Sequence, residues 1–199
     1  GDRAVAIGRP RAFDMDQALD QALHVFWEKG YDGASIADLT EAMGINPPSL
    51  YAAFGNKEAL FKKALDRYEA KRDQIMEEAF AAPTAREAVT RLLEGTAERL
   101  SDKCSPRGCL MVQGALSGGE ECEAVKRDLA CRRAGVEALI RKRLKRAKTE
   151  GDLPSNVDAA ALARFVATVM YGIAVQAAGG AAPKELRAIV NTALRAWPA

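Results

Sequence analysis

The stretch that most constrains this chain is residues 30–57, GYDGASIADLTEAMGINPPSLYAAFGNK. Ser35, with an acidic residue three positions later, is typical of a residue that caps the start of a helix. Gly44 follows where a sharp turn needs a positive φ, and Asn46 with Pro47 predicts the start of another helix. The pattern therefore predicts two short helices joined by a tight turn, the second only about two turns long.

The second of these helices is too short to hold much core, so we interpret it as a surface presented to a partner. Leu50 and Phe54, four residues apart, are predicted to anchor it. Its other residues face outward: Ser49, Tyr51, Ala52 and Ala53. A helix-turn-helix places its second helix in the major groove of DNA, which is about 12 Å wide. Hydroxyl groups and free N–H groups at the helix start are then expected to meet phosphates.

The charge of the chain does not by itself indicate a nucleic-acid partner, because the formal net charge is only +2. Residues 1–80 hold 10 Lys/Arg and 14 Asp/Glu, a net of −4, and residues 81–199 hold 19 and 13, a net of +6. A DNA-binding domain usually has a basic footprint, so this one must make it locally. Residues 1–12 are either a disordered terminus or a flexible basic arm whose Arg9 and Arg11 reach the DNA.

The sequence does not support an enzyme, a metal site or a cofactor. Its four cysteines are 5, 13 and 9 residues apart and there is one histidine, which is a poor zinc pattern. No Ser/His/Asp set or Gly-rich phosphate loop occurs. Residues 1–12 lack the apolar run of a secretory signal, so we expect a reducing cytoplasm with free thiols. The uncharged stretch from Phe165 to Pro183 is interrupted by polar residues and glycines, which favours a buried soluble helix over a membrane span.

The pattern GY-x-x-A-S-I-x-x-L, followed by G-I-x-x-x-S-L-Y-x-x-F-x-x-K-E-x-L, resembles the N-terminal domain of TetR-type transcriptional regulators. The matching residues are Gly30, Tyr31, Ser35, Ile36, Leu39, Gly44, Ile45, Ser49, Leu50, Tyr51, Phe54, Lys57, Glu58 and Leu60. The resemblance covers residues 14–65. It implies an all-α homodimer of about nine helices per chain, a repressor that binds a palindromic operator and is released by a small-molecule inducer.

The resemblance also assigns DNA contacts by position, with Asn46 at the helix start among them. Phosphate contacts fall to Ser35, Tyr51 and Lys57. The residues that would face bases are Pro47, Pro48, Ser49, Ala52 and Ala53. Two positions depart from the pattern: Thr40 stands where alanine is usual, and Ala53 stands where histidine is frequent. The second departure removes one DNA contact.

The chain divides by function into an arm (residues 1–12), a three-helix DNA-binding domain (13–57) and a helical domain for ligand binding and dimerisation (58–199). Periodicity and capping residues predict a long helix from Asn56 to Phe80, which belongs to both halves, and further helices over 84–100, 110–116, 120–149, 157–178 and from 183. Ser155 is expected to cap the helix over 157–178. The helix over 120–149 carries ten Lys/Arg, including Arg132, Arg133 and Arg143, and we interpret this basic run as a solvated face.

The sequence leaves two mechanisms open for the release of DNA. A reversible inducer would sit in an apolar pocket, with candidate lining residues Met111, Gln113, Phe165, Met170, Tyr171 and Gln176, although such a stripe is also typical of plain core. Alternatively, Cys109 at a helix start is a sensor thiolate that pairs with Cys104 or Cys122, or adds to an electrophile. Plain packing of Cys109 is the competing interpretation.

Dimerisation is expected to involve the last two helices, since the helix over 157–178 is apolar nearly all round and should be buried on every face. The interface candidates are Val166, Val169, Ile173, Val190, Leu194 and Trp197. Two such helices per subunit can form a four-helix interface across a two-fold axis. The remaining alternative is an interaction protein that has this fold and does not bind DNA.

Overall fold

The computed structural model describes residues 12–102, 104–113 and 122–198, and within these ranges the chain is all-helical, with nine helices and no strand. The helices are α1 (Ala12–Gly33), α2 (Ile36–Met43), α3 (Pro47–Phe54), α4 (Lys57–Phe80), α5 (Ala85–Leu100), α6 (Leu110–Gln113), α7 (Glu123–Glu150), α8 (Ala159–Ala178) and α9 (Pro183–Arg195). The predicted all-α class is confirmed. The arm with Arg9 and Arg11 lies outside the described residues.

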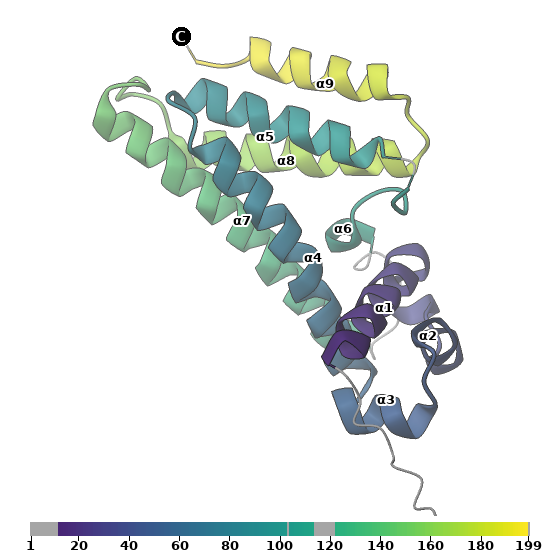
Figure 1. Ribbon diagram of the computed structural model, residues 1–199. Coiled ribbons are helices and arrows are strands. Elements are labelled where there is room, and N and C mark those ends of the chain that lie inside the picture. The colour runs from purple at the N-terminus through teal and green to yellow at the C-terminus, as the bar shows by residue number, and fades with distance from the viewer. Residues whose placement is uncertain (1–11, 103, 114–121, 199) are drawn as a thin grey trace, which may run out of the picture.

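The helices form two groups joined lengthwise by α4 and α7 (Figure 1). Helices α1, α2 and α3 gather around the N-terminal end of α4, and α5, α8 and α9 pack on one another at the opposite end of the molecule. The short α6 lies between the groups, where it contacts α1, α7 and α8. One element thus touches both the predicted DNA-binding end and the C-terminal bundle.

The short helices at the N-terminal end begin where local sequence predicts. Ser35 Oγ accepts from the Asp38 N–H at 3.0 Å, and the Asp38 carboxylate accepts from the Ser35 N–H in return. Asn46 Oδ1 accepts from the Ser49 N–H at 2.9 Å. Asn56 Oδ1 accepts from the Ala59 N–H at 2.7 Å. Each cap satisfies a backbone donor that the first helical turn leaves unpaired.

The core runs without interruption from one group of helices to the other. Phe26, Leu39, Leu50 and Phe61 fill the N-terminal part and are fully buried, and α4 continues into the second part with Leu65 and Met76. Since α4 adds buried residues along most of its length, a tilt of this helix would move both ends of the molecule.

The structure corrects two expectations about α8. The helix begins at Ala159 and its cap is Asp158, whose carboxylate accepts from the N–H groups of Ala160 and Ala161, so Ser155 is not the cap. Nor is α8 buried on every face, since Phe165 is 41% and Val175 51% exposed. By length and composition, α8 is the one helix in the described chain that is apolar enough to cross a membrane, and here it packs against α5, α7 and α9.

The basic run of α7 is not wholly a solvated face, as the sequence had suggested. Arg143 is buried and donates to the carbonyl oxygens of Phe80 and Ala82, at the end of α4, at 3.1 and 2.9 Å. A cation there suits the negative end of the helix dipole. Arg132 and Arg133 also make contacts within the protein, described below.

Candidate nucleic-acid interface and effector pocket

Helix α3 is held by two buried side chains and exposes the rest of its surface. Leu50 is 0% and Phe54 7% exposed, and both belong to the core. We call the other six residues the outer face of α3: Pro47, Pro48, Ser49, Tyr51, Ala52 and Ala53, all exposed. The structure therefore brings together on one surface all the residues that were predicted to face bases.

None of the first four residues of α3 offers a free N–H group to a phosphate, contrary to the expectation from the sequence. Pro47 and Pro48 carry no N–H at the first two helical positions. The next two N–H groups, of Ser49 and Leu50, donate to Asn46 at its side-chain and main-chain oxygens. All of these residues are described, so the anion site that a helix start usually offers is closed here. Asn46 acts as the cap that closes it.

Lys57 stands at the first turn of α4, beside the end of α3. Its Nζ lies 4.6 Å from the ring centroid of Tyr31, a cation–π contact. Tyr31 packs in turn on Phe61 with ring centroids 5.1 Å apart, and burial raises the pKa of its hydroxyl. The aromatic ring orients the ammonium group of Lys57 at the edge of the proposed DNA surface.

Several acidic side chains of the N-terminal part are paired within the protein. The Arg67 guanidinium of α4 donates to both carboxylate oxygens of Asp20 at 2.5 and 2.6 Å, and this pairing lowers the pKa of Asp20. Lys29 pairs with Asp38 at 2.7 Å and holds the pKa of that carboxyl well below its usual range. These contacts tie α1 to α4 and to α2, and they offset part of the negative charge that DNA would meet.

A hollow of about 830 Å³ lies beside α3. The N-terminal half of α1, the α2–α3 turn and α3 itself line it, with Met15, Ile45, Ser49, Ala52 and Ala53 among the lining residues. Small side chains at positions 52 and 53 leave this space open where a bulkier residue would fill it.

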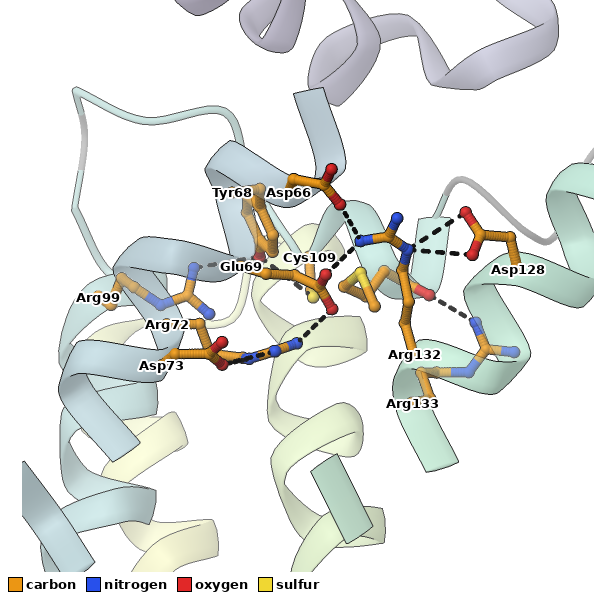
Figure 2. Close-up of polar contacts among 11 residues, drawn as sticks. Asp66, Tyr68, Glu69, Arg72, Asp73, Arg99, Cys109, Asp128, Arg132 and Arg133 are labelled. Carbon is orange, nitrogen blue, oxygen red and sulfur yellow. Dashed lines mark hydrogen bonds and ion pairs between the residues drawn. The ribbon is translucent and has the colours of Figure 1, made fainter. Parts of the chain in front are cut away.

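At the other end of the fold, four of the predicted pocket residues surround one small cavity of about 20 Å³: Cys109, Met111, Met170 and Tyr171. Tyr68 O–H donates to Cys109 Sγ at 3.2 Å and accepts from Arg99 Nη1 at 3.2 Å (Figure 2). Sequence reasoning did not select Tyr68, Arg72, Thr96 or Arg99, which also line the cavity. No local pattern marks them, because they converge from α4 and α5 only in the fold.

Two buried polar atoms in this region have no hydrogen-bond partner among the described residues, the Tyr171 hydroxyl and Gln113 Oε1. Burial raises the pKa of Tyr171 to about 12, with the neighbouring Cys109 adding to the effect. A buried polar group without a partner is uncommon in native proteins and calls for an explanation such as a ligand.

Three other predicted pocket residues, Gln113, Phe165 and Gln176, are not among the residues that line this cavity. Gln176 is exposed, and Phe165 lines a shallow hollow of about 420 Å³ on the surface formed by α8 and α9. The hydrophobic pattern misplaced Phe165 and Gln176 because α8 is apolar on both faces. The neighbouring helices decide which face of such a helix points to the core.

All four cysteines are free thiols in the structure. Cys104 and Cys131 are exposed, whereas Cys109 and Cys122 are buried. The Cys122 thiol lies 3.8 Å from Asp32 Oδ1, and burial raises its pKa, with Asp32 adding to the rise. Cys109 is 6% exposed.

Two sets of contacts connect the pocket to the rest of the molecule. Trp27 of α1 donates its Nε1–H to the carbonyl oxygen of Gly108 at 3.0 Å, and its ring meets Tyr68 edge to face, with centroids 4.9 Å apart. Arg132 of α7 pairs with Asp66 and Glu69 of α4 and with Asp128, and Arg133 donates to the carbonyl oxygen of Met111 (Figure 2). Thus α1, α4, α6 and α7 meet around Cys109.

The predicted dimer residues fall into two groups. Val166, Ile173 and Val190 are 1%, 0% and 1% exposed and face the core of a single chain, so they do not form an outer surface. Val169, Leu194 and Trp197 are half-buried at the edge of the core. The apolar surface of α8 and α9 is instead the hollow lined by Phe165, Val169, Ile189 and Ala193, among others.

Two family models match different parts of the chain. Residues 18–64 match the family model described as bacterial regulatory proteins, tetR family, and residues 85–193 match the tetracyclin repressor-like C-terminal domain. The chain is 35% identical over 196 residues to the HTH-type transcriptional repressor ComR of Escherichia coli strain K12, covering 96% of this chain and 92% of that protein. It is 31% identical to the repressor BdcR of the same strain over 183 residues, covering 90% and 86%.

A solved structure that the chain resembles is a cysteine mutant of the TetR family transcriptional regulator CifR in complex with double-strand operator DNA. The TM-score is 0.92 at 49% sequence identity, and the match covers 96% of this chain and all of that one. A putative TetR transcriptional regulator from Rhodococcus sp. RHA1 is 45% identical, with a TM-score of 0.63, over 91% of this chain and 97% of that one.

Proposed function

Because this chain belongs to the tetR family of bacterial regulatory proteins, a family of transcription factors and not of enzymes, we propose that it represses transcription by binding operator DNA through the outer face of α3. The observation that carries the proposal is this face itself. Six exposed residues lie on a two-turn helix that only Leu50 and Phe54 anchor, and relatives over nearly the full chain are repressors by name.

In this proposal, Tyr51 and Lys57 bind phosphates, Ser35 adds a hydroxyl, and the arm with Arg9 and Arg11 contributes positive charge. Phosphate contacts fix position, whereas contacts with base edges give sequence preference. The functional division is an arm (1–12), a DNA-binding domain (13–57) and an effector and dimerisation domain (58–199). The site of action is the cytoplasm, where the bacterial chromosome lies.

The active form is proposed to be a homodimer on a palindromic operator. One helix of eight residues contacts few base pairs, so two copies on half-sites about 34 Å apart are needed for useful affinity. The apolar surface around Phe165 and Val169 on α8 and Ile189 on α9 supports this assembly, because a contiguous apolar patch on a soluble chain is typical of an interface.

A small-molecule inducer is proposed to release the DNA by binding beside Cys109. The unpartnered Tyr171 hydroxyl offers a polar contact in a cavity whose walls combine apolar side chains such as Met111 and Met170 with the polar Thr96 and Arg99. The cavity of about 20 Å³ holds no more than about one water molecule, so an inducer has to open it. Such opening would displace Tyr68 of α4 and the Gly108 carbonyl that Trp27 of α1 contacts.

A thiol switch at Cys109 is the second candidate, and the Tyr68–Cys109 hydrogen bond is the observation that favours it. An adduct on this buried sulfur would break that bond and enlarge the side chain against α4. Cys109→Ser separates the candidates. A reversible inducer still releases DNA from this variant, whereas an electrophile or oxidant no longer does.

The test of DNA binding is selection of duplexes from a random pool, followed by affinity measurements against salt concentration. We expect one palindromic sequence to be enriched and log K to fall steeply with log salt as phosphate contacts are screened. Tyr51→Ala and Lys57→Ala should weaken binding to every duplex alike, and Ser49→Ala should change the preference at one base pair. A flat salt dependence with no enriched sequence would leave the interaction-protein alternative.

A further inference from the structure

We propose that the outer face of α3 recognises its half-site mainly through the 5-methyl groups of thymine, with Pro47, Pro48 and Ala52 as the methyl-binding surface. This inference rests on the proposed function and deepens it, because it names the chemistry of the bases that the helix selects. Three observations lead to it: the shortage of hydrogen-bond donors on this face, the apolar character of what remains, and the open space beside it.

The outer face offers few groups that can hydrogen-bond to base edges. Of its six residues only Ser49 and Tyr51 carry a polar side chain. The long side chains that usually identify guanine and adenine in the major groove are Arg, Lys, Asn and Gln, and none of them occurs in Pro47–Phe54. Asn46 is the nearest amide, and its oxygen is occupied by the Ser49 N–H.

The main chain at the start of α3 cannot replace the missing side chains. Residues 47 and 48 have no N–H group, and the N–H groups of residues 49 and 50 already donate to Asn46. The tip of the helix that enters the groove first is therefore covered by two proline rings. A surface of C–H groups discriminates between bases only by shape and by apolar contact.

The space around this surface accepts a methyl group without displacing protein atoms. Ala52 and Ala53 are exposed and border the hollow of about 830 Å³. On the opposite wall, Met15 is 41% exposed and presents a further apolar side chain. Among the side chains described within 15–57, Met15 and Tyr51 are the exposed large apolar ones, and Met15 lines the hollow.

Thymine is the base whose major-groove edge is complementary to such an apolar surface. Its C5 methyl is the one apolar group that a base pair places in the major groove, and alanine-type side chains contact it. Removal of one buried methyl group is expected to weaken binding about fourfold. Loss of one such contact in each half-site of a two-fold symmetric operator therefore corresponds to about a fifteenfold loss of affinity.

The experiment compares thymine with uracil, which differ only in this methyl group. Duplexes are selected from a random pool by the full-length protein. The enriched duplex is then resynthesised with deoxyuridine in place of thymidine at one symmetric pair of half-site positions at a time. We expect at least one pair to lower the affinity by about fifteenfold, while the same replacement in the flanking sequence changes nothing.

Protein variants identify the surface that receives the methyl group. Ala52→Ser keeps the side chain small but adds a hydroxyl, and it should reduce the preference for thymine over uracil to less than about twofold. The matched control is Ala37→Ser on α2, another exposed alanine outside the outer face of α3, which should keep the full preference. Circular dichroism and thermal unfolding of both variants confirm that the fold is intact.

The outcomes separate this inference from the function on which it rests. If no duplex is enriched, both the repressor proposal and the methyl contact are wrong. If a duplex is enriched but every uracil-substituted form binds as tightly as the parent, the chain binds a sequence by other means and the methyl inference alone is overturned. The same holds if Ala52→Ser keeps the preference for thymine.

Discussion

At the scale of single residues, the Tyr171 hydroxyl is a buried polar atom without a partner. Burial of a hydroxyl that makes no hydrogen bond costs desolvation energy, and no interaction in the folded state compensates for it. We therefore expect Tyr171→Phe to raise the free energy of unfolding by about 1 kcal/mol at neutral pH, measured by urea denaturation. Tyr68→Phe is the matched comparison. It should lower the stability by a similar amount, because the Tyr68 hydroxyl both donates to Cys109 and accepts from Arg99.

Tyr171 also makes the stability of the protein sensitive to alkaline pH. Its pKa in the folded state is about 12, and an unfolded tyrosine titrates near 10. The folded state holds the phenolic proton more tightly than the unfolded state does. The contribution of this proton to the free energy of unfolding is therefore fully present below about pH 10 and is lost as the pH rises toward 12. The stability lost over this range should be about 2 kcal/mol smaller in Tyr171→Phe than in the parent protein. If the free energy of unfolding falls with pH equally steeply in both proteins, the raised pKa of Tyr171 is contradicted.

At the scale of elements, the hydrogen bond from Trp27 to the Gly108 carbonyl joins α1 to the segment that leads into α6. Trp27→Phe keeps an aromatic ring against Tyr68 and removes the N–H donor together with the five-membered part of the indole. Loss of about 1 kcal/mol at this contact should speed amide hydrogen exchange in residues 110–113 about fivefold. Exchange in α8 should stay unchanged. Unchanged exchange in residues 110–113 would show that α6 is held by packing alone.

Arg132 forms one of the polar connections between α4 and α7. It pairs with Asp66, Glu69 and Asp128 while its side chain is only 17% exposed. Arg132→Gln should lower the free energy of unfolding by about 2 kcal/mol, since partly buried carboxylates lose a counter-charge, although Glu69 keeps Arg72 as a second partner.

The matched control for this prediction is Arg164→Gln. Arg164 pairs with Glu137 but is 77% exposed, and an exposed ion pair contributes no more than about 1 kcal/mol. Denaturation of the two variants side by side tests whether burial decides the effect. Similar losses for both would mean that the contacts of Arg132 contribute no more than a surface pair.

An element could be predicted from the sequence where the interactions that define it join residues close together in the chain. Ser35, Asn46 and Asn56 cap helices through contacts with residues three positions away, so a short window of sequence contains the whole signal. The same locality explains why α2, α3 and the outer face of α3 were placed correctly. The cap of α8 was misplaced because Ser155 and Asp158 are both residue types that cap helices, and the local sequence does not show which of them precedes the first turn.

The effector end was less predictable because its contacts are not local. Tyr68 and Cys109 are 41 positions apart, and Trp27 and Gly108 are 81 apart. No periodic pattern links such pairs. Helix α8 adds a second difficulty. With apolar residues on both sides, its sequence does not distinguish Val166, which faces the core, from Phe165, which faces outward.

At the scale of the whole molecule, the proposed dimer makes the two ends of the chain depend on each other. The surface of α8 and α9 lies at the end opposite α3 (Figure 1). Pairing through this surface would set the spacing of two α3 helices that do not touch. A helix pair that matches half-sites about 34 Å apart binds with both copies at once, so operator affinity depends on the distant apolar contact.

Phe165→Asp tests this dependence. The side chain is 41% exposed on α8 and lines the apolar hollow with Val169 and Ile189. A charge buried at a dimer interface without a partner is costly, so the variant should sediment as a monomer at concentrations where the parent is a dimer. Its affinity for the palindromic duplex should fall at least tenfold, by roughly the advantage of bivalent binding, while its helical content stays unchanged.

Leu139→Asp is the matched control, because Leu139 is 44% exposed on α7 and lines a separate hollow between α4 and α7. It introduces the same charge on an equally exposed apolar residue away from α8 and α9, and should leave both mass and operator affinity unchanged. If Phe165→Asp remains a dimer, the α8 and α9 surface is not the interface. If it becomes a monomer and still binds the full duplex as tightly, the two copies act independently, and the bivalent mechanism is wrong.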